Sequence, residues 1–180
     1  MRAIDWNNVQ EAGDFERLPP NGYICRITAV QDVPEKEYLK LEYDIADSKY
    51  AGYFQDGFAR FGFWSGSFIR SYKETAQGFF KSFLTAIKES NQGFVFNNDE
   101  TALRGKRIGL VLGEEEYTKK DGTIGTRLYV DQTRTVQTIV DGKFTVPAKK
   151  LLAKPASADT GSRYLRDELE DDGMLPFSVG

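Results

Sequence analysis

The alternation of apolar and polar residues predicts strands in the first third of the chain. Residues 23–33 are rich in β-branched and aromatic types, and residues 38–46 alternate strictly after the turn at Pro34-Glu35-Lys36. Because neighbouring side chains of a strand point to opposite faces, the second run has an apolar face and a polar face. The apolar face comprises Leu39, Leu41, Tyr43 and Ile45, and the polar face comprises Tyr38, Lys40, Glu42 and Asp44. The two runs predict a half-buried hairpin, and residues 49–54 predict a third strand after the turn at residues 46–48.

The second half of the chain predicts one helix and two further strands. Residues 79–90 carry apolar side chains at helical spacing, and Asn91-Gln92-Gly93 supplies a helix stop. Residues 107–112 alternate again and continue toward Tyr117, and the turn at residues 120–122 leads to a last strand over residues 126–135. In that strand Leu128 and Val130 are expected to face the core, and Arg127 and Tyr129 to face out. Residues 148–153 predict a final helical turn.

This order of elements predicts a mainly β domain: a five-stranded oligonucleotide-binding (OB) barrel with one helix between strands three and four. A generic sandwich or another small barrel fits the same pattern. We expect the barrel to occupy residues 22–154. An N-terminal arm, residues 1–21, would lie over it through the apolar anchors Ile4, Trp6, Val9, Phe15 and Leu18, and residues 155–180 would form a disordered acidic tail.

Composition narrows the class of protein. The chain of 180 residues contains no histidine and a single cysteine, Cys25, which removes histidine-based catalysis, internal disulfides and cysteine-rich metal sites. We therefore expect no enzyme, no catalytic residues, no cofactor and no metal. A carboxylate site at Glu114, Glu115 and Glu116 is a weak alternative, because consecutive residues of a strand point to opposite faces.

Charge and hydropathy bear on location and partners. The net charge is −3, of which residues 155–180 contribute −4, so the body carries +1. A near-neutral body is compatible with nucleic-acid binding, since a local basic stripe matters more than the total. No apolar run is long enough for a membrane span and no leader is evident, so we expect a cytoplasmic protein that binds no membrane, in the host-cell cytoplasm if a phage encodes it.

Aromatic and basic residues mark a candidate surface for single-stranded nucleic acid. Bases stack on aromatic rings while cations follow the phosphates, and OB barrels use strands two and three and the loops between strands one and two and between strands four and five. Residues 117–127 between the last two strands would form a flexible basic finger; its lysines could also serve only to discourage edge pairing. The candidate residues are Tyr38, Lys40, Tyr53, Arg60, Trp64, Arg70, Lys73, Arg107, Tyr117, Lys119, Lys120, Arg127 and Tyr129.

Residues 58–73 crowd aromatic rings, cations and glycines together. Two interpretations fit this composition: a mobile stacking flap between strand and helix, or a lid packed on the barrel. Because large exposed aromatic surfaces are costly, at least half of these rings are expected to be buried. For Tyr38 and Tyr53, cross-strand packing is the alternative to base stacking.

The C-terminal residues carry a separate signal. A dense run of carboxylates over residues 166–172 cannot fold alone, yet it is followed by apolar residues that solubility does not require. Asp171 and Asp172 before Leu175, Pro176 and Phe177 resemble the acidic tip of bacterial single-stranded DNA-binding proteins, where phenylalanine is the last residue. Here Ser178-Val179-Gly180 follow, so a partner that binds the tip must accept a longer end.

The body is similar to a family of small bacteriophage and prophage proteins described as single-stranded DNA-binding or of unknown function. The likeness spans roughly residues 6–152 and is carried by Ser90-Asn91-Gln92-Gly93-Phe94, by Leu103-Arg104-Gly105-Lys106 and by Glu114-Glu115-Glu116-Tyr117. The resemblance implies a phage replication and recombination protein that coats single-stranded DNA and recruits replication or recombination proteins through its tail. An interaction or structural phage module without nucleic-acid binding is the alternative, and the sequence leaves open whether the chain forms a homo-oligomer.

Overall fold

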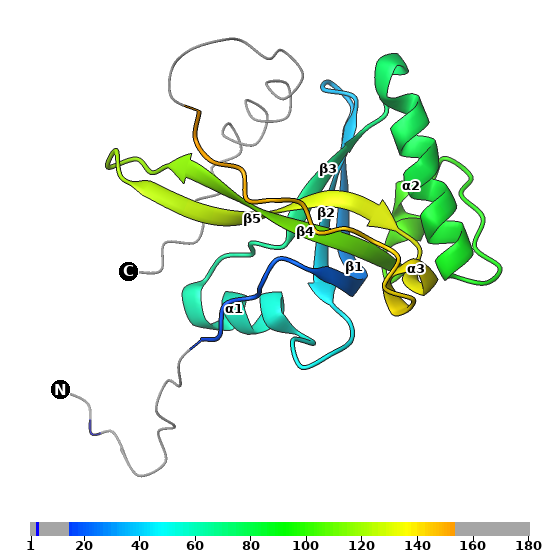
Figure 1. Ribbon diagram of the computed structural model, residues 1–180. Coiled ribbons are helices and arrows are strands. Elements are labelled where there is room, and N and C mark those ends of the chain that lie inside the picture. The colour runs from blue at the N-terminus through cyan, green and yellow to red at the C-terminus, as the bar shows by residue number, and fades with distance from the viewer. Residues whose placement is uncertain (1–2, 4–14, 154–180) are drawn as a thin grey trace.

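The strands form one antiparallel sheet. The computed structural model describes residue 3 and residues 15–153. The strands are β1 (Gly22–Val33), β2 (Tyr38–Ile45), β3 (Ser67–Ser71), β4 (Arg107–Thr118) and β5 (Ile124–Arg134). They are hydrogen-bonded in the order β3-β2-β1-β4-β5, and within the described part of the chain no ladder joins β3 to β5, so the sheet is open (Figure 1). The predicted mainly β class is confirmed.

Within residues 15–153, three α-helices and two short 3₁₀ helices accompany the sheet. These are α1 (Tyr53–Phe61), η2 (Glu74–Ala76), α2 (Gln77–Ser90), η3 (Glu100–Leu103) and α3 (Val136–Val140). The predicted helix is α2, and it lies between β3 and β4 as expected. Pattern reasoning missed α3, and the helical turn predicted over residues 148–153 is wrong: Lys150 instead forms a parallel bridge with Glu115 of β4. None of the helices in the described residues is long and apolar enough to cross a bilayer.

The third strand is misplaced in the sequence prediction, because residues 49–54 form a turn and the start of α1. The cause is the Asp44 carboxylate, which accepts hydrogen bonds from the backbone N–H groups of Ile45 (2.8 Å), Phe54 (2.9 Å) and Gln55 (3.1 Å). It thereby satisfies donors in the first turn of α1 that a helix cannot satisfy itself. Asp44 is buried, and this burial raises the pKa of its carboxyl.

The core lies on the inner face of the curved sheet. Its strand residues include Tyr23, Cys25, Ile27, Leu39, Leu41, Tyr43, Ile45, Ile108, Leu110 and Leu112. Phe83 and Ile87 of α2 are fully buried against them. Because the buried face of a helix repeats its apolar residues at helical spacing, the sequence pattern predicts this helix correctly. The Cys25 side chain has no exposure, and burial raises the pKa of its thiol well above the ordinary value.

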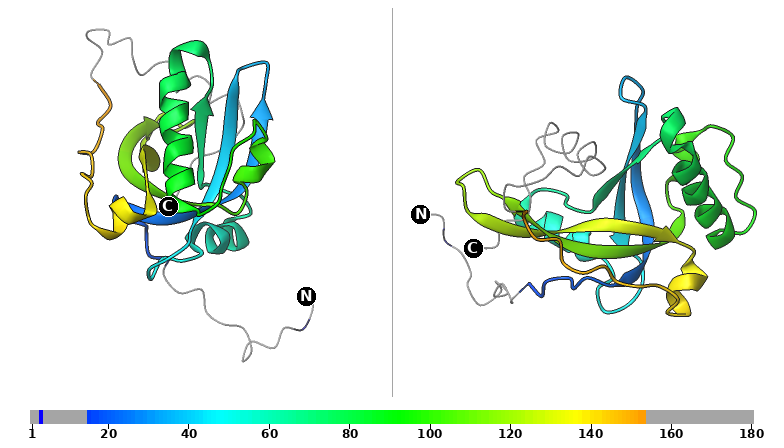
Figure 2. Two further views of the ribbon diagram at one scale, coloured as in Figure 1. Left: turned by 90° about the vertical axis from the view of Figure 1, so that its right-hand side faces the viewer. Right: turned by 45° about the horizontal axis from the view of Figure 1, so that its top comes forward.

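The outer face of β1 and β4 is covered by residues 136–147, which cross it closely at glycines (Figure 2). A Cβ atom at Gly22 would lie 2.4 Å from the ring of Phe144, and one at Gly109 would lie 2.5 Å from Cγ1 of Ile139. Side chains at these positions would push the segment off the sheet. We call residues 143–153, which continue from here along β4, the C-terminal strap.

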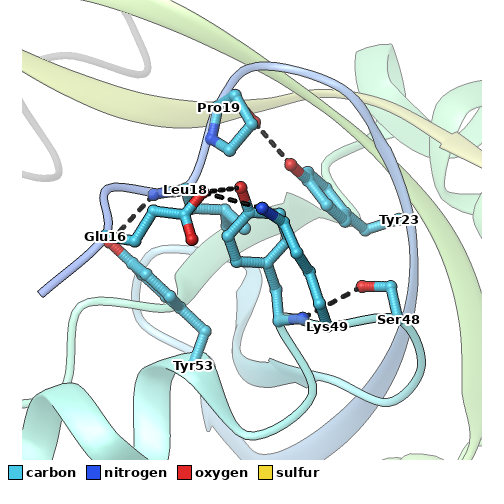
Figure 3. Close-up of polar contacts among 8 residues, drawn as sticks. Glu16, Leu18, Pro19, Tyr23, Ser48, Lys49 and Tyr53 are labelled. Atoms are coloured by element: carbon cyan, nitrogen blue, oxygen red, sulfur yellow. Dashed lines mark hydrogen bonds and ion pairs between the residues drawn. The ribbon is translucent and has the colours of Figure 1, made fainter.

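Residues 15–21 of the predicted arm lie against the domain, whereas Ile4, Trp6 and Val9 fall outside the described residues. Leu18 is buried at 1% exposure, and its backbone N–H donates to Tyr53 Oη at 3.2 Å. The hydroxyl of Tyr23 donates to the carbonyl oxygen of Pro19 at 2.7 Å (Figure 3). Side-chain and backbone bonds therefore hold this short segment beside α1.

Candidate nucleic-acid interface

Strands β4 and β5 continue beyond the rest of the sheet as a hairpin that projects away from α2 (Figures 1 and 2). The hairpin is longer than the predicted basic finger of residues 117–127, and from here on the finger means residues 113–129. Its tip is an ordered turn: Lys119 N–H donates to the Thr123 carbonyl (2.7 Å), and Gly122 N–H donates to the Lys119 carbonyl (2.9 Å). Asp121 accepts from both the backbone N–H and the hydroxyl of Thr123, and these bonds lower the pKa of its carboxyl. Gly122 has φ +82°, a conformation that glycine adopts without cost. The turn leaves Lys120 exposed at the end of the finger.

One face of the finger carries the predicted aromatic and basic residues together. Cross-strand pairing places Tyr117 opposite Gly125, Glu115 opposite Arg127, and Gly113 opposite Tyr129. The Arg127 guanidinium lies 5.2 Å from the centre of the Tyr117 ring, and its Nε is 2.8 Å from Glu115 Oε1. Arg127 and Tyr129 are half-buried, so the prediction that they face outward holds only in part.

The opposite face of the finger packs on the domain and confirms the predicted inward residues. Leu128 and Val130 pack against the core. On the same face Arg17 Nη2 lies 3.0 Å from Glu114 Oε1, and Lys149 Nζ lies 3.4 Å from Glu116 Oε1. With the Arg127 pair, all three consecutive glutamates have a cation of their own. In the described part of the chain, no group of three acidic or cysteine side chains is placed to hold a metal.

Cations distant in sequence change the charge of the finger. Lys150 Nζ lies 3.8 Å from the centre of the Tyr129 ring, and the strap hydrogen-bonds to β4 through Lys150 N to Glu114 O and Glu116 N to Lys150 O, both 2.9 Å. The cationic side chains gathered here are Arg17, Lys119, Lys120, Arg127, Lys149 and Lys150, and the carboxylates are Glu114, Glu115, Glu116 and Asp121. Six cations against four carboxylates leave a basic excess. Three of the six lie outside the finger, and nothing in the local sequence pattern placed them there.

The predicted binding residues of β2, Tyr38 and Lys40, are more buried than the prediction of a solvent-facing strand face requires. Tyr38 is 1% exposed, so its predicted position on a solvent-facing polar face is wrong and its ring offers no free surface to a base. The cross-strand partner of Tyr38 is Ser71. Lys40 is half-buried, and its cross-strand partner Ile69 is buried. The packing alternative for Tyr38 therefore describes the structure.

Arg70 lies on the inner face of the sheet, opposite Leu39. Its guanidinium stacks over the rings of Phe68 (4.8 Å) and Phe83 (6.0 Å), and Nη1 donates to the carbonyl of Ile69 at 2.9 Å. Burial lowers the pKa of Arg70 to about 10, so it stays protonated at neutral pH. Its stem and guanidinium extend the core rather than reach solvent freely, and Lys73 follows half-buried just after the strand.

Residues 58–73 form neither a single flap nor a single lid, since they contain the end of α1 and all of β3. Trp64 is half-buried, with its indole N–H donating to the Gly66 carbonyl at 2.9 Å. Phe58 and Phe61 keep exposures of 46% and 44%. These rings leave an apolar patch on α1.

Tyr53 begins α1 and does not belong to a strand. Its ring centre lies 4.7 Å from that of Phe15, and Arg60 lies over the same phenylalanine at 5.5 Å. The carboxylate of Glu16 receives hydrogen bonds from Lys49 and Tyr50, both at 2.8 Å (Figure 3). An open pocket between the 15–21 segment and α1 is lined in part by these residues, so the structure places Tyr53 and Arg60 beside this segment and not on the finger.

Arg107 lies at the end of β4 away from the finger. Its Cα partner on β1 is Arg26, an exposed residue that the sequence analysis did not select. The structure thus assembles Tyr117, Lys119, Lys120, Arg127 and Tyr129 on the finger and leaves the other predicted residues elsewhere. The tail residues Asp171, Asp172, Leu175, Pro176 and Phe177 lie outside the described residues.

Comparison with known proteins provides no family assignment. No protein-family model matches the chain, and no curated protein matches it.

Proposed function

We propose that this protein binds single-stranded DNA without reading its sequence, on an OB-type barrel opened between β3 and β5. The sheet order β3-β2-β1-β4-β5, antiparallel throughout, with α2 between β3 and β4, supports the OB assignment. In such barrels the loop between strands four and five contacts oligonucleotides. The finger occupies this place in the chain.

The observation that carries the proposal is the finger itself. It brings an aromatic ring at Tyr117, another at Tyr129 and a basic excess together on a projecting hairpin. Stacking of bases on such rings contributes about 1–3 kcal/mol each and is tolerant of sequence, while nearby cations neutralise phosphates. This combination suits an unpaired strand better than a duplex, whose bases are already stacked.

A salt titration tests the proposal. We expect the full chain to bind a homopolymer of deoxythymidine in a gel shift, more tightly than duplex DNA, with affinity falling as salt rises. Lys119→Gln with Lys120→Gln should flatten the log–log salt slope by about 1.4, since each phosphate contact to a single strand contributes about 0.7. The matched control is Lys81→Gln with Lys88→Gln, which removes two exposed lysines from α2, away from the finger. No binding by the unaltered chain, or equal effects of both pairs, would contradict the proposal.

The tail is the proposed recruitment element for phage replication and recombination proteins. Its apolar Leu175, Pro176 and Phe177 would enter a pocket on the partner while Asp171 and Asp172 meet a basic rim. When no DNA is bound, the acidic tail would fold back on the basic surface, and the phosphates of an incoming strand would have to displace it. Deleting residues 166–180 should therefore abolish partner capture and preserve DNA binding, or tighten it at low salt if the tail competes. Equal or weaker binding by the truncated chain at low salt would count against this competition.

An interaction module without nucleic-acid binding is the second candidate. The half-exposed Phe58 and Phe61 on α1 favour it, because exposed apolar patches commonly mark protein interfaces. The same gel shift separates the two functions, since a protein-binding module would show no affinity for the homopolymer at any salt concentration.

A further inference from the structure

Two arginines face each other across neighbouring strands at the end of β4 that is distant from the finger. Arg26 of β1 is the direct cross-strand partner of Arg107 of β4. Directly opposed side chains have Cβ atoms about 4.5–5.5 Å apart, and like charges in this position destabilise a sheet. A nearby negative charge would therefore stabilise the arrangement.

The carboxylates beside this pair supply little of this stabilisation. Asp44 is the partner of Arg26 on the β2 side, but both of its oxygens accept backbone N–H groups around the start of α1. Asp47 reaches Arg107 Nη2 at 4.0 Å, and its side chain is 66% exposed, so this contact is long and screened by water. Within residues 15–153, no ion pair or side-chain hydrogen bond involves the guanidinium of the exposed Arg26.

Arg107 is also fixed in place with one donor unused. Its backbone N–H donates to Asn91 Oδ1 (2.9 Å) and its carbonyl accepts from Asn91 Nδ2 (2.8 Å), which ties the start of β4 to the end of α2. Its Nε is buried and has no hydrogen-bond partner among the described residues. An unsatisfied buried donor is costly. The Arg107 side chain as a whole is 43% exposed, so a ligand would reach it beyond this buried nitrogen.

We propose that Arg26 and Arg107 together bind a phosphate group of the bound single strand, as a second contact point apart from the finger. Guanidinium groups present donors in a fork that matches phosphate oxygens, and two of them would share one phosphate or two successive ones. The identity of the ligand as a nucleic-acid phosphate rests on the proposed function. The paired arginines and the unused donor do not depend on it.

The length of β4 sets a requirement on the ligand. Between Arg107 and Thr118 the strand advances eleven residues, or about 36 Å at about 3.3 Å per residue. A strand of a stacked duplex spaces its phosphates about 3.4 Å apart, and an unpaired strand extends up to about twice as far, so a strand that touches both the finger and the arginine pair needs about five to ten nucleotides. A shorter oligonucleotide occupies one contact point only.

The test compares deoxythymidine homopolymers of about 3 and about 30 nucleotides, lengths below and above this requirement. Arg26→Gln with Arg107→Gln should flatten the salt slope for the long homopolymer by about 1.4 and lower its affinity. The loss should be much smaller for the short homopolymer, which can still bind at the finger. Arg26→Lys with Arg107→Lys keeps the charge but not the fork, so we expect an intermediate affinity. The matched control is again Lys81→Gln with Lys88→Gln.

A second measurement uses inorganic phosphate and needs no oligonucleotide. Replacing chloride by phosphate at constant ionic strength should raise the Tm of the unaltered protein more than that of the Arg26→Gln, Arg107→Gln variant. In chloride the variant should be at least as stable as the unaltered protein, because a like-charge pair has been removed, and this also shows that it folds.

The outcomes separate this inference from the proposed function. If the unaltered chain binds no oligonucleotide, the proposed function fails and the strand contact fails with it. If the chain binds the long homopolymer and the arginine variant binds it with the same affinity and salt slope, only the arginine contact is wrong. An equal phosphate effect on the Tm of both proteins would likewise overturn the paired-arginine site.

Discussion

The two halves of β4 show how one strand serves two purposes. Residues 107–112 lie between β1 and β5, with the core on one face and residues 136–147 covering much of the other. Residues 113–118 extend beyond the end of the pairing with β1. They pair with β5 on one edge and with Lys150 on the other, and they carry three glutamates. The first half is held by apolar packing and the second by ion pairs.

The difference predicts where stability and binding are located. Burial of apolar side chains contributes several kcal/mol at a single position, whereas a partly exposed ion pair contributes about 1 kcal/mol or less. Truncation of the buried apolar side chains in the first half of β4 should therefore destabilise the domain strongly. Changes in the second half should alter the charge of the finger while the fold persists.

Leu110→Ala should have the largest effect on stability. Leu110 has no exposure and lies in the centre of the core, so its truncation should lower the free energy of unfolding by about 2–5 kcal/mol in a urea titration. Ile124→Ala on the finger, where the side chain is 63% exposed, is the matched truncation and should change it by about 0.5 kcal/mol or less. Similar losses in both variants would show that the finger is part of the same packed unit.

Gly109→Ala should have the next largest effect, about 1–3 kcal/mol of destabilisation. A Cβ there would lie 2.6 Å from the backbone carbonyl oxygen of Thr135 as well as against Ile139, and backbone cannot yield as a flexible side chain does. Gly78→Ala in α2 is the control: its Cβ meets nothing within 4 Å, and alanine favours a helix, so the Tm should stay or rise. If Gly109→Ala leaves the Tm unchanged, residues 136–147 do not cover the sheet closely.

Glu115→Gln should have the smallest effect on stability, about 1 kcal/mol or less, and a clear effect on binding. It removes the negative charge that neutralises Arg127 at 2.8 Å, so single-stranded DNA should bind more tightly and the salt slope should steepen by about 0.7. Glu89→Gln changes the net charge equally from an exposed position on α2 and should alter binding less. An equal gain in both variants would mean that Arg127 does not contact the strand.

The candidate site was predicted only where local pattern decides position. The hairpin turn and its alternation placed Tyr117, Lys119 and Lys120 on a projecting finger, and the structure agrees. The pairing of Arg127 with Glu115 follows from strand register, which the turn does not specify on its own. Arg26 had no local signal, because its significance comes from the strand beside it.

The β-rich class, four of the five strands and α2 were determined by the sequence, because their apolar side chains repeat at the period of the element that buries them. Tertiary structure decided the rest. Residues 49–54 form a turn and the start of α1 because the buried Asp44 carboxylate accepts hydrogen bonds from the first turn of the helix. Arg17, Lys149 and Lys150 reach the finger because residues 15–21 and the C-terminal strap pack beside it. Periodicity reports which face of an element is buried, whereas the partner across that face is chosen only when the chain folds.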